Sequence, residues 1–396
     1  MLNTPFSPWP SFTQEEADAV ARVLLSNRVN YWTGQECREF EREFAAWVGV
    51  PHAVALANGT VALDVALAAL GIGPGDEVVV TPRTFMASAS CVVTAGATPV
   101  FAEIDRDSGN LTADTIRAAL TPKTRAVICV HLGGMPCDMD PIMALAAEHS
   151  LFVIEDCAQA HGATYKGRCV GSIGHIGAWS FCQDKVMTTG GEGGMVTTHD
   201  RALWSRMWSY KDHGKSHEAV YERQHPPGYR WLHESFGTNW RMIEVQAVIG
   251  RIQLVRMPAW TAARRANAER IWATAREFPV FRVPELPGWA GHGCYKCYVY
   301  VEPDRLAPGW DRDRLQREIN ERGVPCYSGS CSEVYLEKAF DDRATDGRPW
   351  RPAERFPVAR ELGETSLMFL VHPTLTPAEI DKTCAVLREV APLATK

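Results

Sequence analysis

Lysine is the scarce cation of this chain, which has nine lysines against thirty-two arginines. The formal net charge is −6 and no basic stripe is visible, which argues against nucleic acid as a partner. No apolar run approaches the roughly 20 residues that cross a bilayer, so we expect no membrane partner. The segment from Met1 to Phe6 lacks the basic and apolar regions of a signal peptide, which favours a cytoplasmic location.

Metal-binding patterns are also scarce. Of the twelve cysteines, only Cys294 and Cys297 form a C-x-x-C pair, and a zinc site would need two further close ligands. Other cysteines lie inside apolar, strand-like runs, where a free thiol behaves as a small buried hydrophobe. We therefore predict no metal site and reduced thiols in a cytosolic protein.

The length fits two domains better than one. Between about residues 53 and 200, helical segments alternate with short apolar runs, at 53–56, 77–81, 98–102, 126–130, 151–154, 178–181 and 194–197. Fully apolar strands that alternate with helices indicate a mostly parallel sheet covered on both faces. The sequence thus predicts an α/β domain over residues 1–257 and a smaller C-terminal α+β domain over residues 258–396, divided near Pro258.

Further helices are predicted at both ends of the chain. Thr13-Gln14-Glu15-Glu16 reads as the capped start of a helix over residues 13–26, and a second helix is expected over 40–48. In the C-terminal half we expect helices over 246–257, 264–275, 312–322 and 377–390, and a strand over 298–301. Residues 210–236 form a polar, aromatic segment that we interpret as a binding loop.

Lys185 differs from most of the other lysines because it follows an apolar run and precedes the glycine-rich stretch from Gly190 to Gly194. That stretch lacks the spacing of a nucleotide-binding fingerprint, so we interpret it as a turn that lets backbone pass close to Lys185. A lysine held at a strand end can be partly desolvated, and its neutral amine is then a nucleophile or Schiff-base former.

Asp156 is the second candidate functional residue, after Lys185. It ends the apolar run from Leu151 to Ile154, at the point where α/β proteins place ligands. An aspartate together with a Schiff-base lysine is the pair that pyridoxal 5′-phosphate (PLP) requires, because the lysine holds the aldehyde and the aspartate keeps the pyridine nitrogen protonated. The cofactor phosphate needs backbone N–H groups at a helix start, which Gly59 and Thr60 would supply.

The chain resembles the DegT/DnrJ/EryC1/StrS aminotransferases, which are sugar aminotransferases of PLP fold type I. The resemblance rests on the order and spacing of many short motifs, which are residues 32–34, 40–44, 57–63, 75–78, 84–85, 96–101, 155–159, 180–181, Lys185, 191–194 and 239–242. It weakens after about residue 290.

The resemblance implies an aspartate aminotransferase-like fold and further cofactor contacts. Phe85 would stack on the pyridine ring, Gln159 would lie near the ring hydroxyl, and Ser180 would contact the phosphate. Asn239 would cross a homodimer interface and bind the phosphate in the neighbour's active site, with Arg241 beside it. His161 and Glu155 are interpreted as structural residues.

The resemblance also implies the reaction. It predicts transfer of an amino group from L-glutamate to a keto group on a nucleotide-linked sugar, a 4-keto-6-deoxyhexose, for amino-sugar and O-antigen or other surface-polysaccharide biosynthesis. Two segments depart from the family pattern where they would touch that sugar: residues 210–236, and Cys326 to Cys331, where many relatives carry a histidine-tyrosine segment.

Three alternatives remain open. A cyclitol (keto-inositol) aminotransferase would differ only in its acceptor pocket. A PLP-dependent sugar dehydratase of the same family usually has histidine in place of the lysine, so Lys185 argues against it. The third is a regulatory protein that binds PLP without turnover, and conversion to the pyridoxamine form by glutamate would separate it from an enzyme.

Overall fold

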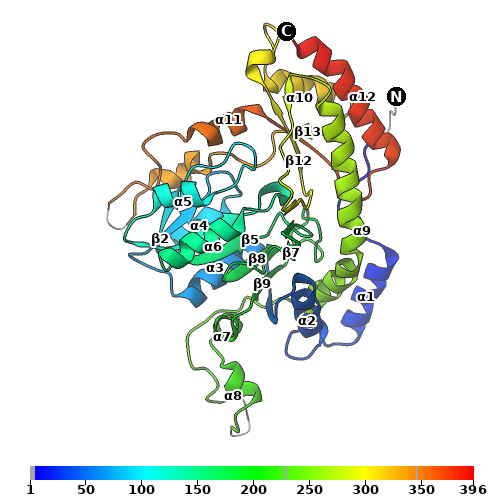
Figure 1. Ribbon diagram of the computed structural model, residues 1–396. Helices are drawn as coiled ribbons and strands as arrows, with labels where there is room; N and C mark the ends of the chain where they lie inside the picture. Colours follow the sequence, from blue (N-terminus) through cyan, green and yellow to red (C-terminus); the bar gives the residue numbers. More distant parts are fainter. Residues whose placement is uncertain (1–4, 226–227, 229, 345–346) are drawn as a thin grey trace.

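The computed structural model describes residues 5–225, 228, 230–344 and 347–396. Its main layer is a seven-stranded sheet in the order β1-β9-β8-β5-β4-β2-β3 (Figure 1). The strands of this sheet are β1 (His52–Leu56), β2 (Glu77–Val80), β3 (Thr98–Phe101), β4 (Thr124–Val130), β5 (Phe152–Asp156), β8 (Ile176–Ser180) and β9 (Gly194–Thr198). Only β9 runs antiparallel to its neighbours, so the predicted mostly parallel α/β sheet is confirmed.

The helices of this part of the chain precede β1, alternate with the strands from β1 to β5, or follow β9. They are α1 (Gln14–Leu25), α2 (Glu36–Val48), α3 (Gly59–Leu70), α4 (Ala87–Thr94), α5 (Ala113–Ala119), α6 (Met139–Glu148), α7 (Arg201–Tyr210) and α8 (His217–Tyr221). The start of α1 has the capping box expected from Thr13 and Glu16. Helix α2 begins four residues earlier than the sequence predicted, at Glu36.

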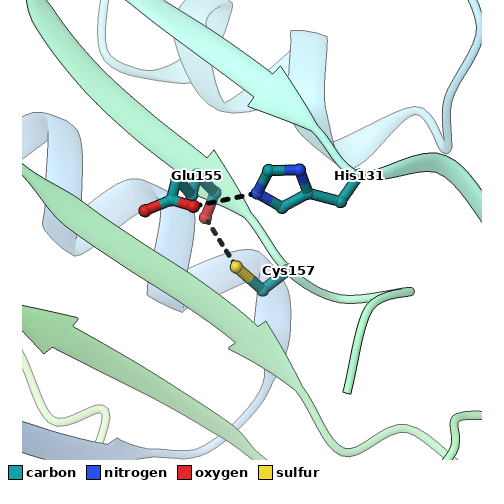
Figure 2. Close-up of side chains that lie close together, drawn as sticks. All are labelled: His131, Glu155 and Cys157. Atoms are coloured by element: carbon teal, nitrogen blue, oxygen red, sulfur yellow. Dashed lines mark hydrogen bonds and ion pairs between the residues drawn. The ribbon is translucent and has the colours of Figure 1, made fainter. Parts of the chain in front are cut away.

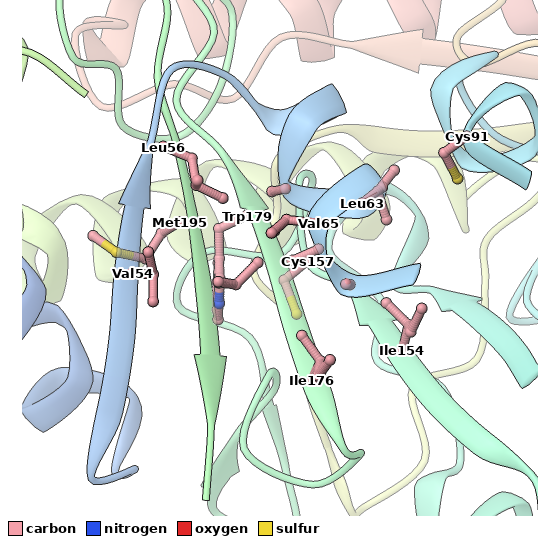
Figure 3. Close-up of a cluster of buried hydrophobic side chains, with 14 of the residues drawn as sticks. Val54, Leu56, Leu63, Val65, Cys91, Ile154, Cys157, Ile176, Trp179 and Met195 are labelled. Carbon is pink, nitrogen blue, oxygen red and sulfur yellow. The ribbon is translucent and has the colours of Figure 1, made fainter. Parts of the chain in front are cut away.

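The core lies between the sheet and these helices. Figure 3 shows side chains of β1, β8, β9 and α3 packed against one another, including Val54, Met195, Trp179 and Leu63. Because all five residues of β8 and of β9 are buried, a periodicity of two is absent from both strands, as in sheets covered on both faces. This packing fixes the strand ends that carry the functional residues.

Helix α9 (Glu244–Ala275) runs continuously through Pro258. The sequence predicted two helical segments with an interruption near that proline, and this expectation was wrong. A proline removes one helical hydrogen bond and crowds the preceding turn, but α9 packs on α1 and α2 before Pro258 and on α12 (Pro377–Ala394) after it. Tertiary packing outweighs the local cost. The domain division at residues 257 and 258 stays a prediction.

The C-terminal part builds a second, smaller sheet of four antiparallel strands in the order β10-β12-β14-β13. Its elements are β10 (Phe281–Arg282), β12 (Cys297–Val301), α10 (Arg312–Glu321), β13 (Cys326–Tyr327), α11 (Pro357–Thr365) and β14 (Ser366–Phe369). A separate cluster of buried apolar residues lies between this sheet, α10 and α12. The predicted α+β character of this part is confirmed.

A third sheet was not predicted. It joins three strands of two residues each: β6 (Thr164–Tyr165), β7 (Arg168–Cys169) and β11 (Ala290–Gly291). Strands this short carry no readable periodicity. In the 210–236 segment, α8 and a bridge between Lys215 and His233 give partial order, while residues 226, 227 and 229 lie outside the described residues. None of the helices in the described ranges combines the length and apolar content needed to cross a membrane.

Candidate active site

A cavity of about 530 Å³ lies where β5 and β8 end and α3 begins. We call it the inner chamber. Seven of the eight residues singled out from the sequence line it: Gly59, Thr60, Phe85, Asp156, Gln159, Ser180 and Lys185. They come from distant parts of the chain, because parallel strands deliver their carboxyl ends to one edge of the sheet.

Asp156 is the last residue of β5 and is 6% exposed. One carboxylate oxygen accepts from Ser88 Oγ at 2.7 Å, and the other accepts from the backbone N–H of Ala158 at 3.1 Å. Burial raises the pKa of Asp156, although these two hydrogen bonds and the charge of Lys185 oppose the shift. Within the described residues, no cation lies within 4.0 Å of this carboxylate.

The start of α3 forms an anion cradle. Asn58 caps the helix by accepting from the Val61 N–H at 3.0 Å, and no acidic side chain lies in the first turn. The N–H groups of Gly59 and Thr60 have no partner within the helix and meet the positive end of its dipole. A Cβ at Gly59 would lie 2.5 Å from the Cβ of Ser180, so glycine permits the helix to approach the end of β8.

Two further residues bound the inner chamber. Phe85 is 68% exposed and carries its ring at the cavity wall. Gln159 is buried, and its Oε1 accepts from the Gly133 N–H at 2.9 Å. That bond fixes the amide orientation, so the NH₂ group of Gln159 remains as the donor toward a ligand.

Lys185 lies just after β8, and its side chain is 15% exposed. Its Nζ is 3.5 Å from Asp184 Oδ1 and 5.2 Å from the centre of the Tyr295 ring. The Tyr295 hydroxyl donates to Asp184, and the indole N–H of Trp9 donates to the Lys185 carbonyl at 2.8 Å. Burial alone would raise the pKa of Asp184, but Lys185, Tyr295 and Lys296 outweigh it and hold that pKa below its usual range.

These observations fit PLP. A buried carboxylate with no cation within 4.0 Å among the described residues matches a protonated ring nitrogen. The N–H groups of Gly59 and Thr60, which have no partner within α3, match a phosphate, and the Lys185 amine lies in the same chamber. Asp156, Gly59, Thr60, Ser180, Gln159 and Lys185 are the residues that would hold the cofactor. When bound there, PLP would supply an electron sink for proton removal next to an amino group.

A second cavity of about 600 Å³ shares five residues with the inner chamber: Thr84, Phe85, Gln159, Asp184 and Lys185. We call it the outer chamber. Apart from Met86, the other residues that line it come from the C-terminal part, among them Tyr295, Lys296, Ser330 and Glu337. The outer chamber gives a substrate room to reach Lys185 from the side of the small sheet.

Sequence reasoning missed four residues that touch this site: Trp9, Ser88, Asp184 and Tyr295. Ser88 and Asp184 are close in sequence to Phe85 and Lys185, so their position was a usable signal. Trp9 and Tyr295 approach Lys185 only through the tertiary fold, and no local pattern marks them.

Glu155, which directly precedes Asp156 in the chain, pairs with His131 in a buried network. Figure 2 shows this pair. The Glu155 carboxylate accepts from His131 Nε2 at 3.0 Å and from the N–H groups of Gly171, Ile173 and Gly174. His131 Nδ1 accepts from the Cys137 N–H at 3.0 Å, so Nε2 carries the proton.

The lone pairs of Glu155 and of the His131 ring are therefore used within the protein, although these two residues and Cys157 are close enough to resemble a metal site. Burial alone would raise the pKa of Glu155, but His131 and the backbone donors hold it below its usual range. The backbone N–H of His131 also donates to the backbone carbonyl of Asp156 at 3.2 Å. The network thus fixes the strand end that presents Asp156.

His161 lies in the core, where its ring packs against Trp179 and Phe181. Neither ring nitrogen has a hydrogen-bond partner among the described residues. Burial, together with the charges of Lys185 and Arg264, lowers the pKa of His161 to about 3, so the ring is neutral. It does not line either chamber.

Asn239 does not line the inner chamber of its own chain. Its side chain is exposed, and its backbone bridges Asp212. Arg241 pairs with Asp212 at 2.7 Å and bridges Leu56, the last residue of β1. Asn239 is therefore held near the cradle edge of the sheet, but it is not among the residues that line the cavity shared by the other seven.

The comparisons with known proteins agree with this geometry. Residues 10–388 match the DegT/DnrJ/EryC1/StrS aminotransferase family. The chain is 37% identical over 388 residues to GDP-perosamine synthase of Caulobacter vibrioides, covering 96% of each chain. It is 38% identical over 337 residues to L-glutamine:2-deoxy-scyllo-inosose aminotransferase of Streptomyces kanamyceticus, covering 82% of this chain and 78% of that protein.

A solved structure points the same way. An aminotransferase from Psychrobacter cryohalolentis has a TM-score of 0.94 to this chain at 66% identity, with 98% of each chain covered. The chain therefore belongs to the DegT/DnrJ/EryC1/StrS aminotransferase family. It is a PLP-dependent enzyme of this family, with the fold type I architecture that the sequence predicted.

Proposed function

We propose that this enzyme transfers an amino group from L-glutamate to the keto group of a nucleotide-linked sugar, a 4-keto-6-deoxyhexose. The observation that carries the proposal is the joining of Lys185, Asp156 and the α3 cradle in one chamber that opens into a second, substrate-sized chamber. The similarity to an enzyme named for a GDP-linked sugar supports the acceptor class. The product would serve amino-sugar and O-antigen or other surface-polysaccharide biosynthesis.

Each residue has a defined task in this proposal. Lys185 Nζ would hold the cofactor aldehyde until the donor amine displaces it, and the freed lysine amine would then take a proton from the donor Cα. Asp156 keeps a proton on the ring nitrogen, and Gly59, Thr60 and Ser180 bind the phosphate. Phe85 and Gln159 orient the ring. The Asp184 carboxylate lies 3.5 Å from the Lys185 amine and would help to position it.

The proposal includes a homodimer with shared active sites. Asn239 is exposed and lies outside its own chamber, so it is free to bind the phosphate in the site of a neighbouring subunit. A dianionic phosphate needs several donors, and those on α3 come from one side only.

The acceptor is tested by a panel of keto sugar nucleotides that varies the nucleotide and the position of the ketone. The pyridoxamine form is first made with L-glutamate, and return of the visible PLP absorbance then reports amino transfer. Recovery with a 4-keto-6-deoxyhexose nucleotide and not with the sugar alone is the expected result. Recovery with none of the sugar nucleotides would contradict the proposal.

The similarity to an L-glutamine:2-deoxy-scyllo-inosose aminotransferase favours a cyclitol acceptor as the second candidate. The two functions differ in donor and in acceptor charge, since a keto-cyclitol carries no diphosphate. If L-glutamine converts the PLP form, L-glutamate does not, and a keto-inositol restores the absorbance, the cyclitol function replaces the first proposal.

A further inference from the structure

We propose that Lys296 and Ser330 form an oxyanion subsite in the outer chamber, which binds a carboxylate or phosphate group of a substrate beside Lys185. The proposal rests on the proposed aminotransferase function, in which both substrates carry such groups. An amino-acid donor brings carboxylates, and a nucleotide-linked sugar brings a diphosphate. The shared chemistry is a negatively charged oxygen group that needs positively charged and hydroxyl donors.

Lys296 is a half-buried cation that forms no ion pair within 4.0 Å among the described residues, although its charge is felt by Asp184. It directly precedes β12, and its backbone N–H donates to the Gly133 carbonyl at 3.1 Å, which fixes its position. In the part of the chain that the structure describes, its Nζ makes one hydrogen bond, a long one of 3.5 Å to Ser330 Oγ. A partly desolvated ammonium group in this state is an incomplete ion pair.

Lys296 is also close to the reactive amine. Its Nζ lies 5.2 Å from the centre of the Tyr295 ring, and Lys185 Nζ lies 5.2 Å from the same point. The two nitrogens therefore cannot be farther apart than twice that distance. Both residues line the outer chamber, so an oxyanion on a molecule that reacts at Lys185 would share that chamber with Lys296.

Ser330 can act only as a donor toward a ligand. The Tyr298 hydroxyl accepts from the Ser330 N–H at 2.9 Å and donates to Ser330 Oγ at 3.2 Å. With Lys296 as the second donor to Oγ, both lone pairs of the Ser330 hydroxyl are used. The remaining O–H proton is available to an acceptor in the chamber, which an oxyanion provides.

Gly329 allows this arrangement. Its φ of +85° lies in the left-handed region, and a Cβ there would lie 2.3 Å from Cε1 of Tyr298. Glycine thus lets the chain press against the Tyr298 ring and place Ser330 next to its hydroxyl. Residues 326–331 are one of the two segments in which the sequence departs from the family pattern, and Gly329 and Ser330 of this segment line the outer chamber.

The electrostatics at this corner favour an anion. Burial alone would raise the pKa of Tyr298, but the charges of Lys296 and Arg83 and the bonds to Ser330 outweigh it and hold that pKa below its usual value. The Arg83 guanidinium lies 4.9 Å from the Tyr298 ring, is fully buried and has no hydrogen-bond partner among the described residues. Of the acidic groups that line the chamber, Asp184 is already bound by Tyr295 and Lys185, and Glu337 is exposed.

The first test needs no turnover. PLP-loaded enzyme, whose phosphate cradle is filled, is titrated with inorganic pyrophosphate by calorimetry. Lys296→Met should weaken binding about 10-fold or more, since hydrogen bonds to charged groups contribute that much, and Ser330→Ala should weaken it less. Lys296→Arg, which keeps the charge, should restore part of the binding. Visible absorbance and circular dichroism confirm that each variant is folded and loaded.

Lys166→Met is the matched control. Lys166 Nζ lies 5.3 Å from the Tyr165 ring centre, much as Lys296 lies over Tyr295, but Lys166 already pairs with Asp140 and lines neither chamber. Pyrophosphate binding by this variant should match wild type. Binding by Lys296→Met within about twofold of wild type, or no binding by wild type at millimolar pyrophosphate, would overturn the subsite.

Two further arms identify the source of the oxyanion. In the donor arm, the rate of conversion to the pyridoxamine form is followed against L-glutamate concentration. In the acceptor arm, UDP, GDP and dTDP are titrated into the pyridoxamine form. The arm in which Lys296→Met causes the 10-fold loss names the source. If pyrophosphate binding depends on Lys296 but neither arm responds even in wild type, the subsite stands and the proposed function falls.

Discussion

At the scale of single residues, Asp156 carries a conflict between stability and function. Its carboxylate is buried without a cation within 4.0 Å among the described residues, and burial raises its pKa. A carboxyl group whose pKa is raised by folding destabilises the folded state as pH rises from its unfolded pKa through its folded pKa. The charge of Asp156 therefore lowers the stability of the cofactor-free protein, and the protonated ring nitrogen of a bound cofactor would compensate it.

Asp156→Asn should therefore have opposite effects without and with the cofactor. The cofactor-free variant should be at least as heat-stable as wild type near pH 7, and this difference should vanish at pH values where wild-type Asp156 is protonated. The loaded variant should lose on the order of 10²-fold in rate, because the ring nitrogen loses its charged partner. Thermal unfolding across pH and single-turnover kinetics measure the two effects. Wild-type rates in Asp156→Asn would remove it from the role of ring partner.

Lys185→Ala tests the other half of the site. The side chain lies in a chamber, and its amine makes no hydrogen bond to the described residues, so the variant should fold while losing the covalent hold on the cofactor and all turnover. Borohydride reduction followed by mass spectrometry should find PLP fixed to wild type and to the control Lys166→Ala, and not to Lys185→Ala. A fixed cofactor in Lys185→Ala would place the linkage on another lysine.

At the scale of elements, the site depends on how closely α3 approaches the end of β8. Gly59 starts the helix and meets Ser180 at a distance that leaves no room for a Cβ. Both α3 and β8 pack into the common core, so neither can move far without disturbing packing. Cradle geometry is thus set by helix–strand packing and not by the cap alone.

Gly59→Ala should displace the start of α3 from Ser180. We expect overpacking to cost about 1–3 kcal/mol in stability and PLP affinity to fall about 10-fold, because the N–H donors leave the phosphate position. Absorbance titration of the cofactor-free protein and thermal unfolding measure these changes. Gly288→Ala is the control, since a Cβ there would meet open space and its backbone is not left-handed. Unchanged PLP affinity in Gly59→Ala would separate the cradle from the phosphate.

At the scale of the whole molecule, the exposed position of Asn239 raises the question of which subunit it serves. If it binds the neighbour's phosphate, each active site is built from two chains. Mixing Lys185→Ala with Asn239→Ala chains should then restore activity after subunit exchange. A hybrid dimer would contain one site with both defects and one site with neither.

Mass spectrometry of the exchanged dimers provides the control for that experiment. Activity should rise toward half of the wild-type value per hybrid dimer, and it should not rise when either variant is mixed with itself. Demonstrated exchange without recovery would place Asn239 in its own subunit's site or outside any site.

Much of the fold and of the site could be predicted from local signals. Apolar runs bounded by turns located the strands, because a strand buried on both faces must be apolar throughout. Asp156 and Lys185 each follow such a run, and the helix start at Gly59 and Thr60 follows another. Each of these features depends on neighbours in sequence, which is why periodicity and turn chemistry suffice to find them.

Other features were decided by contacts between distant segments. The continuity of α9 through Pro258 depends on packing against α1, α2 and α12, which no local pattern contains. Trp9 and Tyr295 lie far before and far after Lys185 in the sequence, and the fold brings both close to it. The sequence by itself determined the family, the cofactor chemistry and the strand ends that present it. Only the tertiary structure decided what surrounds the reactive lysine, because side chains far apart in sequence meet there through packing of the two parts of the molecule.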